Sequence, residues 1–124
     1  MRISRDKFDS YIEAAIEELP PEFKKWLDEV PLIVEDEPPQ YLLDEVGVDE
    51  EGELLGNYNG VALTHRSVSD SGQTPDHIYI FRQALVDMCE TEEELALEIK
   101  KTVFHELGHY AGFDEEDLEN MGYA

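Results

Sequence analysis

The sequence contains one cysteine, few basic residues and no long apolar run. Cys89 alone allows no disulfide within the chain, which is typical of a reducing compartment. The first twenty residues carry acidic side chains throughout and no continuous apolar segment, so we expect a cytoplasmic protein without a secretory signal or a membrane span. Nine Lys and Arg against 31 Asp and Glu give a formal net charge of -22. Such a surface repels phosphate backbones and anionic lipids, so neither nucleic acid nor a membrane is an expected partner.

The length and apolar content predict one folded domain over residues 1–124. A chain of 124 residues with 41% hydrophobic residues can bury a core of its own. We interpret the acidic excess chiefly as a solvated coat, with attraction of basic peptide segments as the alternative.

Helices are predicted in the N-terminal third. Apolar residues recur at helical spacing from Asp6 to Leu19, and two prolines close that segment. A second short helix is predicted to start at Pro21 and to carry Phe23, Trp26, Leu27 and Val30. The β-branched centre of "VPLIVEDEPP" (30–39) predicts a strand, and "PQYLLDEVGV" (39–48) predicts one or two helical turns.

A small sheet is predicted in the middle of the chain. "DEEGELLGNYNG" (49–60) is typical of a loop or turn. "GVALTHRS" (60–67) and "HIYIFRQA" (77–84) are two strand candidates whose spacing favours a hairpin or meander. "LVDMCE" (85–90) is a short segment that we interpret as helical.

A long helix is predicted near the C-terminus. Thr91 and Glu94 have the spacing of a capping box, and Gly112 is the left-handed residue at which helices often end. Between them a buried stripe is predicted at i, i+4 steps: Leu95, Ile99, Val103 and Leu107. Helices first, a small sheet next and a long helix last indicate an α+β fold.

Two histidines on this helix have the spacing of zinc ligands. His105 and His109 lie four residues apart, so both imidazoles project from one face, one turn apart. Glu106 lies about 100° further round the helix, where it can reach a water on the metal and not the metal itself. This is the H-E-x-x-H pattern, in which zinc lowers the pKa of the water and the glutamate acts as general base.

A third protein ligand is expected after Gly112. In H-E-x-x-H-x-x-G-x-x-H zincins the third ligand lies six residues after the second histidine, and that position is Glu115 here. A carboxylate is an acceptable zinc ligand. Three neighbouring acids compete for the role and leave the assignment open: Asp114, Glu116 and Asp117. Gly108 costs about 1 kcal/mol in a helix relative to Ala, so it either makes room for backbone or substrate or is simply tolerated.

The alternative is a solvated amphipathic helix that merely contains two histidines. One pre-specified five-residue pattern arises by chance in under about one in a hundred chains of this length, at average residue usage. Metal binding is therefore favoured. Four other polar residues are further candidates for the site, and each is interpreted chiefly as a strand-end or packing residue: His65, His77, Tyr110 and Tyr123. Cys89 is expected to be a small buried residue and not a nucleophile.

Two runs resemble the small bacterial zincin-like metallopeptidases, once classed as a domain of unknown function. These are "NYNGVALTHRSVSDSGQTPDHIYIFRQAL" and "VFHELGHYAGFDEEDLENMGYA", and the resemblance covers about residues 54–124. It implies a minimal zincin fold with His105 and His109 as zinc ligands, Glu106 as catalytic base and Glu115 as third ligand. The family pattern usually has Asp at that last position, and His65 stands where relatives would have an acid.

The leading hypothesis is a zinc-dependent peptidase-like hydrolase that acts on a peptide or protein substrate. Two other classes remain as alternatives: a metal-binding module without turnover, and an acidic interaction protein that occupies basic partner surfaces. Zinc binding without cleavage would indicate the first alternative. Binding that collapses with added salt and survives His105→Ala would indicate the second.

Overall fold

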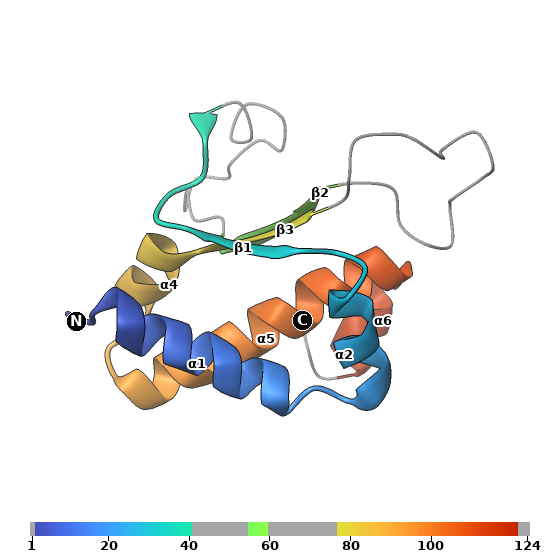
Figure 1. The fold of residues 1–124 in the computed structure, drawn as a ribbon, viewed down its shortest axis with the longest axis horizontal. Helices are drawn as coiled ribbons and strands as arrows, with labels where there is room; N and C mark the ends of the chain where they lie inside the picture. The colour runs from blue at the N-terminus through green and yellow to red at the C-terminus, as the bar shows by residue number, and fades with distance from the viewer. Residues whose placement is uncertain (1, 41–54, 60–76, 122–124) are drawn as a thin grey trace.

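The computed structural model describes residues 2–40, 55–59 and 77–121, and within them a three-stranded sheet packs against helices (Figure 1). The elements in chain order are α1 (Arg5–Glu17), α2 (Pro21–Leu27), β1 (Leu32–Glu35), β2 (Gly56–Asn59), β3 (His77–Phe81), α4 (Arg82–Met88), α5 (Glu92–Ala111) and α6 (Glu115–Asn120). The α+β class predicted from the sequence is confirmed. No helix in the described ranges is both long and apolar enough to span a membrane.

The N-terminal helices form where the sequence predicts them. Ser4 caps α1 by accepting a hydrogen bond from the backbone of Lys7, and α1 buries Phe8, Ile12 and Ala15. The second helix begins at Pro21 as predicted, but it ends at Leu27. Val30 lies beyond this helix and is nevertheless fully buried, so its placement on the helix was wrong.

The sheet has the order β1-β3-β2, with β1 parallel and β2 antiparallel to the central β3. The strand predicted within residues 30–39 is confirmed as β1. The strand predicted over 77–84 is confirmed only to Phe81, because Arg82 already begins α4. The predicted helical turns at 39–48, strand at 60–67 and connection at 68–76 lie wholly or almost wholly outside the described residues.

Strand β2 was wrongly predicted as part of a loop. Its sequence "GNYN" is rich in residues that disfavour strands, so local propensity gives no signal for it. Pairing with β3 supplies the backbone hydrogen bonds, with Gly56 opposite Ile80. A methyl carbon added at Gly56 would lie 2.8 Å from the Thr102 side chain and 2.9 Å from the Tyr79 carbonyl oxygen. Only glycine therefore allows β2 to lie this close to α5.

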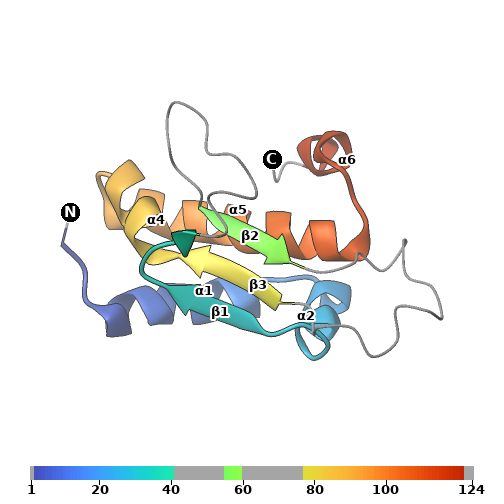
Figure 2. The same cartoon turned by 90° about the horizontal axis from the view of Figure 1, so that it is seen from above.

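Helix α5 runs beneath the sheet and alongside α1, as Figures 1 and 2 show. The predicted stripe from Leu95 to Leu107 is confirmed, and all four of its members are fully buried. Thr91 caps the helix as predicted by accepting from the Glu94 backbone. The return bond goes from the Glu90 backbone to Glu94, one residue earlier than in a regular capping box. The helix ends at Gly112, whose φ of 101° is left-handed as predicted.

Candidate metal centre

The last two turns of α5 bring the two histidines together. The buried stripe of α5 fixes its rotation about its own axis, and this leaves His105 and His109 half-buried on the side toward β2. Their Nε2 atoms lie 3.0 Å apart, and the ring planes meet at 83°. The imidazoles thus converge on one point instead of stacking side by side.

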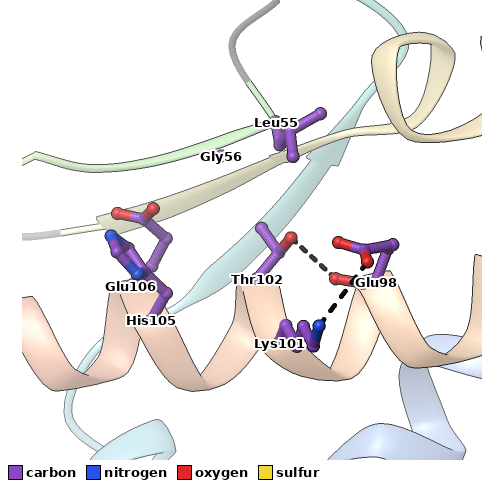
Figure 3. Close-up of a pocket in the computed structure, with 7 residues that line it drawn as sticks. All are labelled: Leu55, Gly56, Glu98, Lys101, Thr102, His105 and Glu106. Carbon is purple, nitrogen blue, oxygen red and sulfur yellow. Dashed lines mark hydrogen bonds and ion pairs between the residues drawn. The ribbon is translucent and has the colours of Figure 1, made fainter. Parts of the chain in front are cut away.

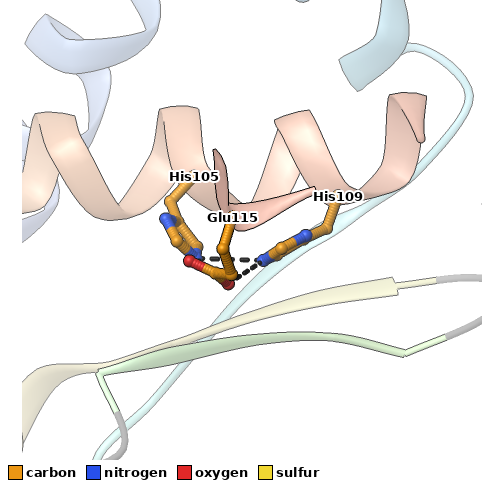
Figure 4. A group of neighbouring side chains, drawn as sticks. All are labelled: His105, His109 and Glu115. Atoms are coloured by element: carbon orange, nitrogen blue, oxygen red, sulfur yellow. Dashed lines mark hydrogen bonds and ion pairs between the residues drawn. The ribbon is translucent and has the colours of Figure 1, made fainter. Parts of the chain in front are cut away.

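Glu115 completes the group from the first turn of α6. Its Oε1 lies 3.1 Å from Nε2 of His105 and 2.9 Å from Nε2 of His109. Figure 4 shows the three side chains converging beside α5, with the Glu115 side chain between those of the two histidines. This is the group of His, Cys, Asp and Glu side chains within the described residues whose ligand atoms could hold one metal ion.

The structure separates Glu115 from the neighbouring acids. Asp114 is the N-cap of α6 and accepts from the backbone N–H of Asp117, while the Asp117 carboxylate accepts from the backbone N–H of Asp114. This reciprocal capping box occupies both carboxylates. Glu116 is exposed, and Glu115 is the acid whose oxygen lies beside both imidazoles.

A backbone carbonyl sets the tautomer of His109. The ring Nδ1 lies 3.2 Å from the carbonyl oxygen of Phe113. A carbonyl only accepts, so Nδ1 carries a proton, and in the neutral ring Nε2 then presents its lone pair toward His105 and Glu115. Histidines that bind metals are usually held by a hydrogen bond of this kind.

The donor set fits a zinc ion. Two imidazole nitrogens and one carboxylate oxygen are ligands that zinc prefers, and three protein ligands leave one position open, as in catalytic zinc sites. Ligand atoms around one tetrahedral zinc lie about 3.3–3.5 Å apart. The triangle observed here, with sides of 2.9 to 3.1 Å, is a few tenths of an ångström smaller. Half-exposed side chains can open by that amount.

Glu106 is not one of the three residues of the ligand group. It is only 8% exposed and lies between α5 and β2, where the methylene Cγ of its side chain would be 3.3 Å from a methyl carbon added at Gly56. Figure 3 shows its carboxylate directed toward the strands, beside the ring of His105. It therefore stands next to the triangle without belonging to it.

A cavity of about 430 Å³ opens beside Glu106 and His105. Its lining comes from the start of β2 and from one face of α5: Leu55, Gly56, Glu98, Lys101, Thr102, His105 and Glu106 (Figure 3). Within the wall, Lys101 pairs with Glu98, and the hydroxyl of Thr102 donates to the backbone carbonyl of Glu98. The cavity thus combines apolar surface with charged groups next to the histidines.

Other residues considered from the sequence lie elsewhere or outside the described ranges. Tyr110 is buried in the core, and its hydroxyl donates to Glu29. Cys89 is buried, and burial together with the charges of Glu98 and Glu94 raises the pKa of its thiol. That pKa direction opposes formation of a thiolate nucleophile.

Of the other three site candidates, only His77 lies within the described residues. His77 begins β3, has a buried Nε2 and packs its ring against Tyr79, and it is not part of the ligand group. His65 and Tyr123 lie outside the described residues.

Sequence reasoning missed two contributors to the site. Gly56 was interpreted as a loop residue, although an isolated glycine before a strand can indicate close approach of another segment. The carbonyl of Phe113 has no sequence signal at all, because any residue supplies one. The sequence does not decide between the two interpretations of Gly108, and the structure places Leu118 of α6 against its bare Cα.

The sequence matches the family model described as Zincin-like metallopeptidase over residues 27–123. No curated protein matches the chain. The match includes both histidines, Glu106 and Glu115, and it reaches further toward the N-terminus than the resemblance found from motifs alone. The chain belongs to the zincin-like metallopeptidase family.

Proposed function

We propose that the protein is a zinc-dependent peptidase, in which His105, His109 and Glu115 hold the metal and Glu106 is the general base. The observation that carries this proposal is the convergence of two Nε2 atoms and one carboxylate oxygen within 3.1 Å of one another. Three electron-rich atoms at this separation repel one another unless a proton or a cation lies among them.

The buried acid beside the triangle supports a role in hydrolysis. A zinc ion held there would polarise the scissile carbonyl and lower the pKa of the attacking water. Glu106 would take a proton from that water and pass it to the nitrogen of the leaving amine. Glu106 is buried between α5 and β2, and its side chain forms part of the cavity wall.

The cavity supports a substrate larger than water. Its walls are formed by β2 and α5, so an extended peptide could lie along the strand with one side chain in the cavity. The apolar side chain of Leu55 and the ion pair of Lys101 with Glu98 offer contacts to such a side chain.

Substitution Glu106→Gln tests the proposal. We expect the variant to keep its zinc and to lose about 10²- to 10⁴-fold in peptide cleavage, because the amide cannot accept the proton. Metal content and cleavage of a broad peptide library are measured on both proteins. Glu116→Gln, which makes the same charge change on the exposed face of α6, should cleave like the wild type.

Two outcomes would contradict the proposal. Cleavage that survives Glu106→Gln would remove the assigned role of this residue. Stoichiometric zinc without cleavage of any peptide by the wild type would instead favour a metal-binding module without turnover.

A further inference from the structure

The position of Glu115 depends on a very short helix. Glu115 is the first residue of α6, which has six residues, and its side chain is 68% exposed. An isolated helix of this length is unstable in water. The contacts of α6 with the rest of the protein must therefore decide where the carboxylate of Glu115 lies.

Leu118 anchors α6 to α5 at Gly108. Leu118 is fully buried, and it lies three residues after Glu115, on an adjacent part of the same helix face. A methyl carbon added at Gly108 would lie 2.3 Å from Cδ2 of Leu118, 3.3 Å from Cγ and 3.4 Å from Cδ1. The leucine side chain thus occupies the space that any other residue at position 108 would fill with its own Cβ.

The anchor and the ligands share one turn of α5. Gly108 directly precedes His109 and follows His105 by three residues. Its carbonyl also accepts the backbone N–H of Phe113 at 2.9 Å, and the carbonyl of Phe113 in turn orients the ring of His109. These hydrogen bonds fix the start of the connection between α5 and α6. The contact of Leu118 with α5 then fixes the direction of α6.

We propose that Gly108 and Leu118 are positioning residues of the metal centre: their contact places Glu115 opposite the two histidines. The proposal rests on the metal binding proposed above. It also links metal binding to the docking of α6, because each favours the arrangement that the other requires. Neither residue supplies a ligand atom.

Substitution Gly108→Ala, Leu118→Ala and the double substitution test the contact. Zinc affinity is measured for each by competition with a chromophoric chelator. We expect each single substitution to weaken zinc binding about 10- to 100-fold, the range typical of residues that orient ligands. Leu118 is enclosed on all sides, so its side chain cannot simply rotate away from the added methyl group.

The double substitution should show strong non-additivity. The three atoms nearest to the added methyl carbon all belong to Leu118 beyond its Cβ, and Leu118→Ala removes them. The double variant should therefore bind zinc no more weakly than Leu118→Ala alone. Losses that multiply would show that the two residues act independently and would overturn the proposal.

A Glu115→Ala background separates positioning from general damage. If Gly108 acts through Glu115, Gly108→Ala should change zinc affinity less than about twofold once that carboxylate is absent. An undiminished loss in this background would overturn the proposal. Ile99→Val, a conservative truncation in the buried stripe of α5 two turns before the histidines, serves as control and should leave zinc affinity unchanged.

Failure of this inference can be told from failure of the metal site. Alanine is the better helix former, so Gly108→Ala does not weaken α5 itself, and circular dichroism checks that the fold is kept. Wild-type protein that binds no zinc would refute the metal centre and this proposal with it. Zinc bound equally by the wild type, Gly108→Ala and Leu118→Ala would refute the positioning role alone.

Discussion

At the scale of single residues, the centre depends on which atoms of each side chain face inward. His109 directs Nε2 inward because its Nδ1–H donates to the Phe113 carbonyl. Asp114 and Asp117 are withdrawn from the centre because each caps the backbone of the other. The carboxylate of Glu115 lies beside both imidazoles. The length of the Glu115 side chain then decides whether its carboxylate reaches them.

Glu115→Asp tests that length. The carboxylate would be drawn back by one methylene while α6 stays anchored at Leu118, so we expect zinc affinity to fall about tenfold. Chelator competition measures the effect, and Glu116→Asp on the exposed face of α6 is the matched control. Unchanged or tighter zinc binding by Glu115→Asp would contradict the view that α6 is positioned for a glutamate.

The ligand types and their spacing could be predicted from the sequence, but the choice among the acids could not. The i, i+4 histidines follow from helix periodicity, and Glu115 from its distance to His109. Distinguishing Glu115 from Asp114 or Asp117 requires knowing where α6 begins, because the carboxylate of the N-cap residue accepts a hydrogen bond from the helix backbone. Helix starts are the least predictable feature of a sequence, and this one depends on tertiary docking.

At the scale of elements, glycines set the distances between α5 and its neighbours. Gly56 lets β2 lie over α5 beside Glu106, and Gly108 lets α6 dock beside His109. The long helix and its buried stripe could be predicted because they are periodic over several turns. Strand β2 could not, because "GNYN" has weak strand propensity and forms through pairing with β3.

Ion pairs connect three element ends away from the metal centre. Asp36, just after β1, accepts from Nε of Arg82 at 2.9 Å and also pairs with Arg5. These arginines begin α4 and α1 respectively. The hydrogen bond from Arg82, with help from the charge of Arg5 and against the effect of burial, holds the pKa of Asp36 below its ordinary value of 3.8.

This pKa direction gives a pH-dependent contribution to stability. A carboxyl whose pKa is lower in the folded state stabilises the protein above its unfolded pKa, and that contribution disappears as the pH falls through the folded value. We therefore expect Asp36→Asn to lower the thermal midpoint by a constant amount above about pH 5 and by a shrinking amount below about pH 4. Thermal unfolding at a series of pH values measures this. A difference between the two proteins that persists undiminished at pH 2–3 would contradict the assignment.

At the scale of the whole molecule, the chain that carries the candidate metal centre is strongly acidic. The net charge of -22 attracts cations and basic peptide segments at low ionic strength, and salt screens this attraction. The family match begins at residue 27, so the three strands and α4 lie within it together with the candidate metal centre, whereas α1 and nearly all of α2 precede it. The candidate ligands come from one long helix, α5, and one short helix, α6, and in our proposal the packing between these helices determines the geometry of the centre.

The most direct test of the metal centre is a crystal structure of the protein with zinc, with data collected at the zinc absorption edge. We expect one anomalous peak within about 2.0–2.2 Å of Nε2 of His105, Nε2 of His109 and one carboxylate oxygen of Glu115. A peak held by other residues, or no peak between these three side chains under excess zinc, would contradict the account.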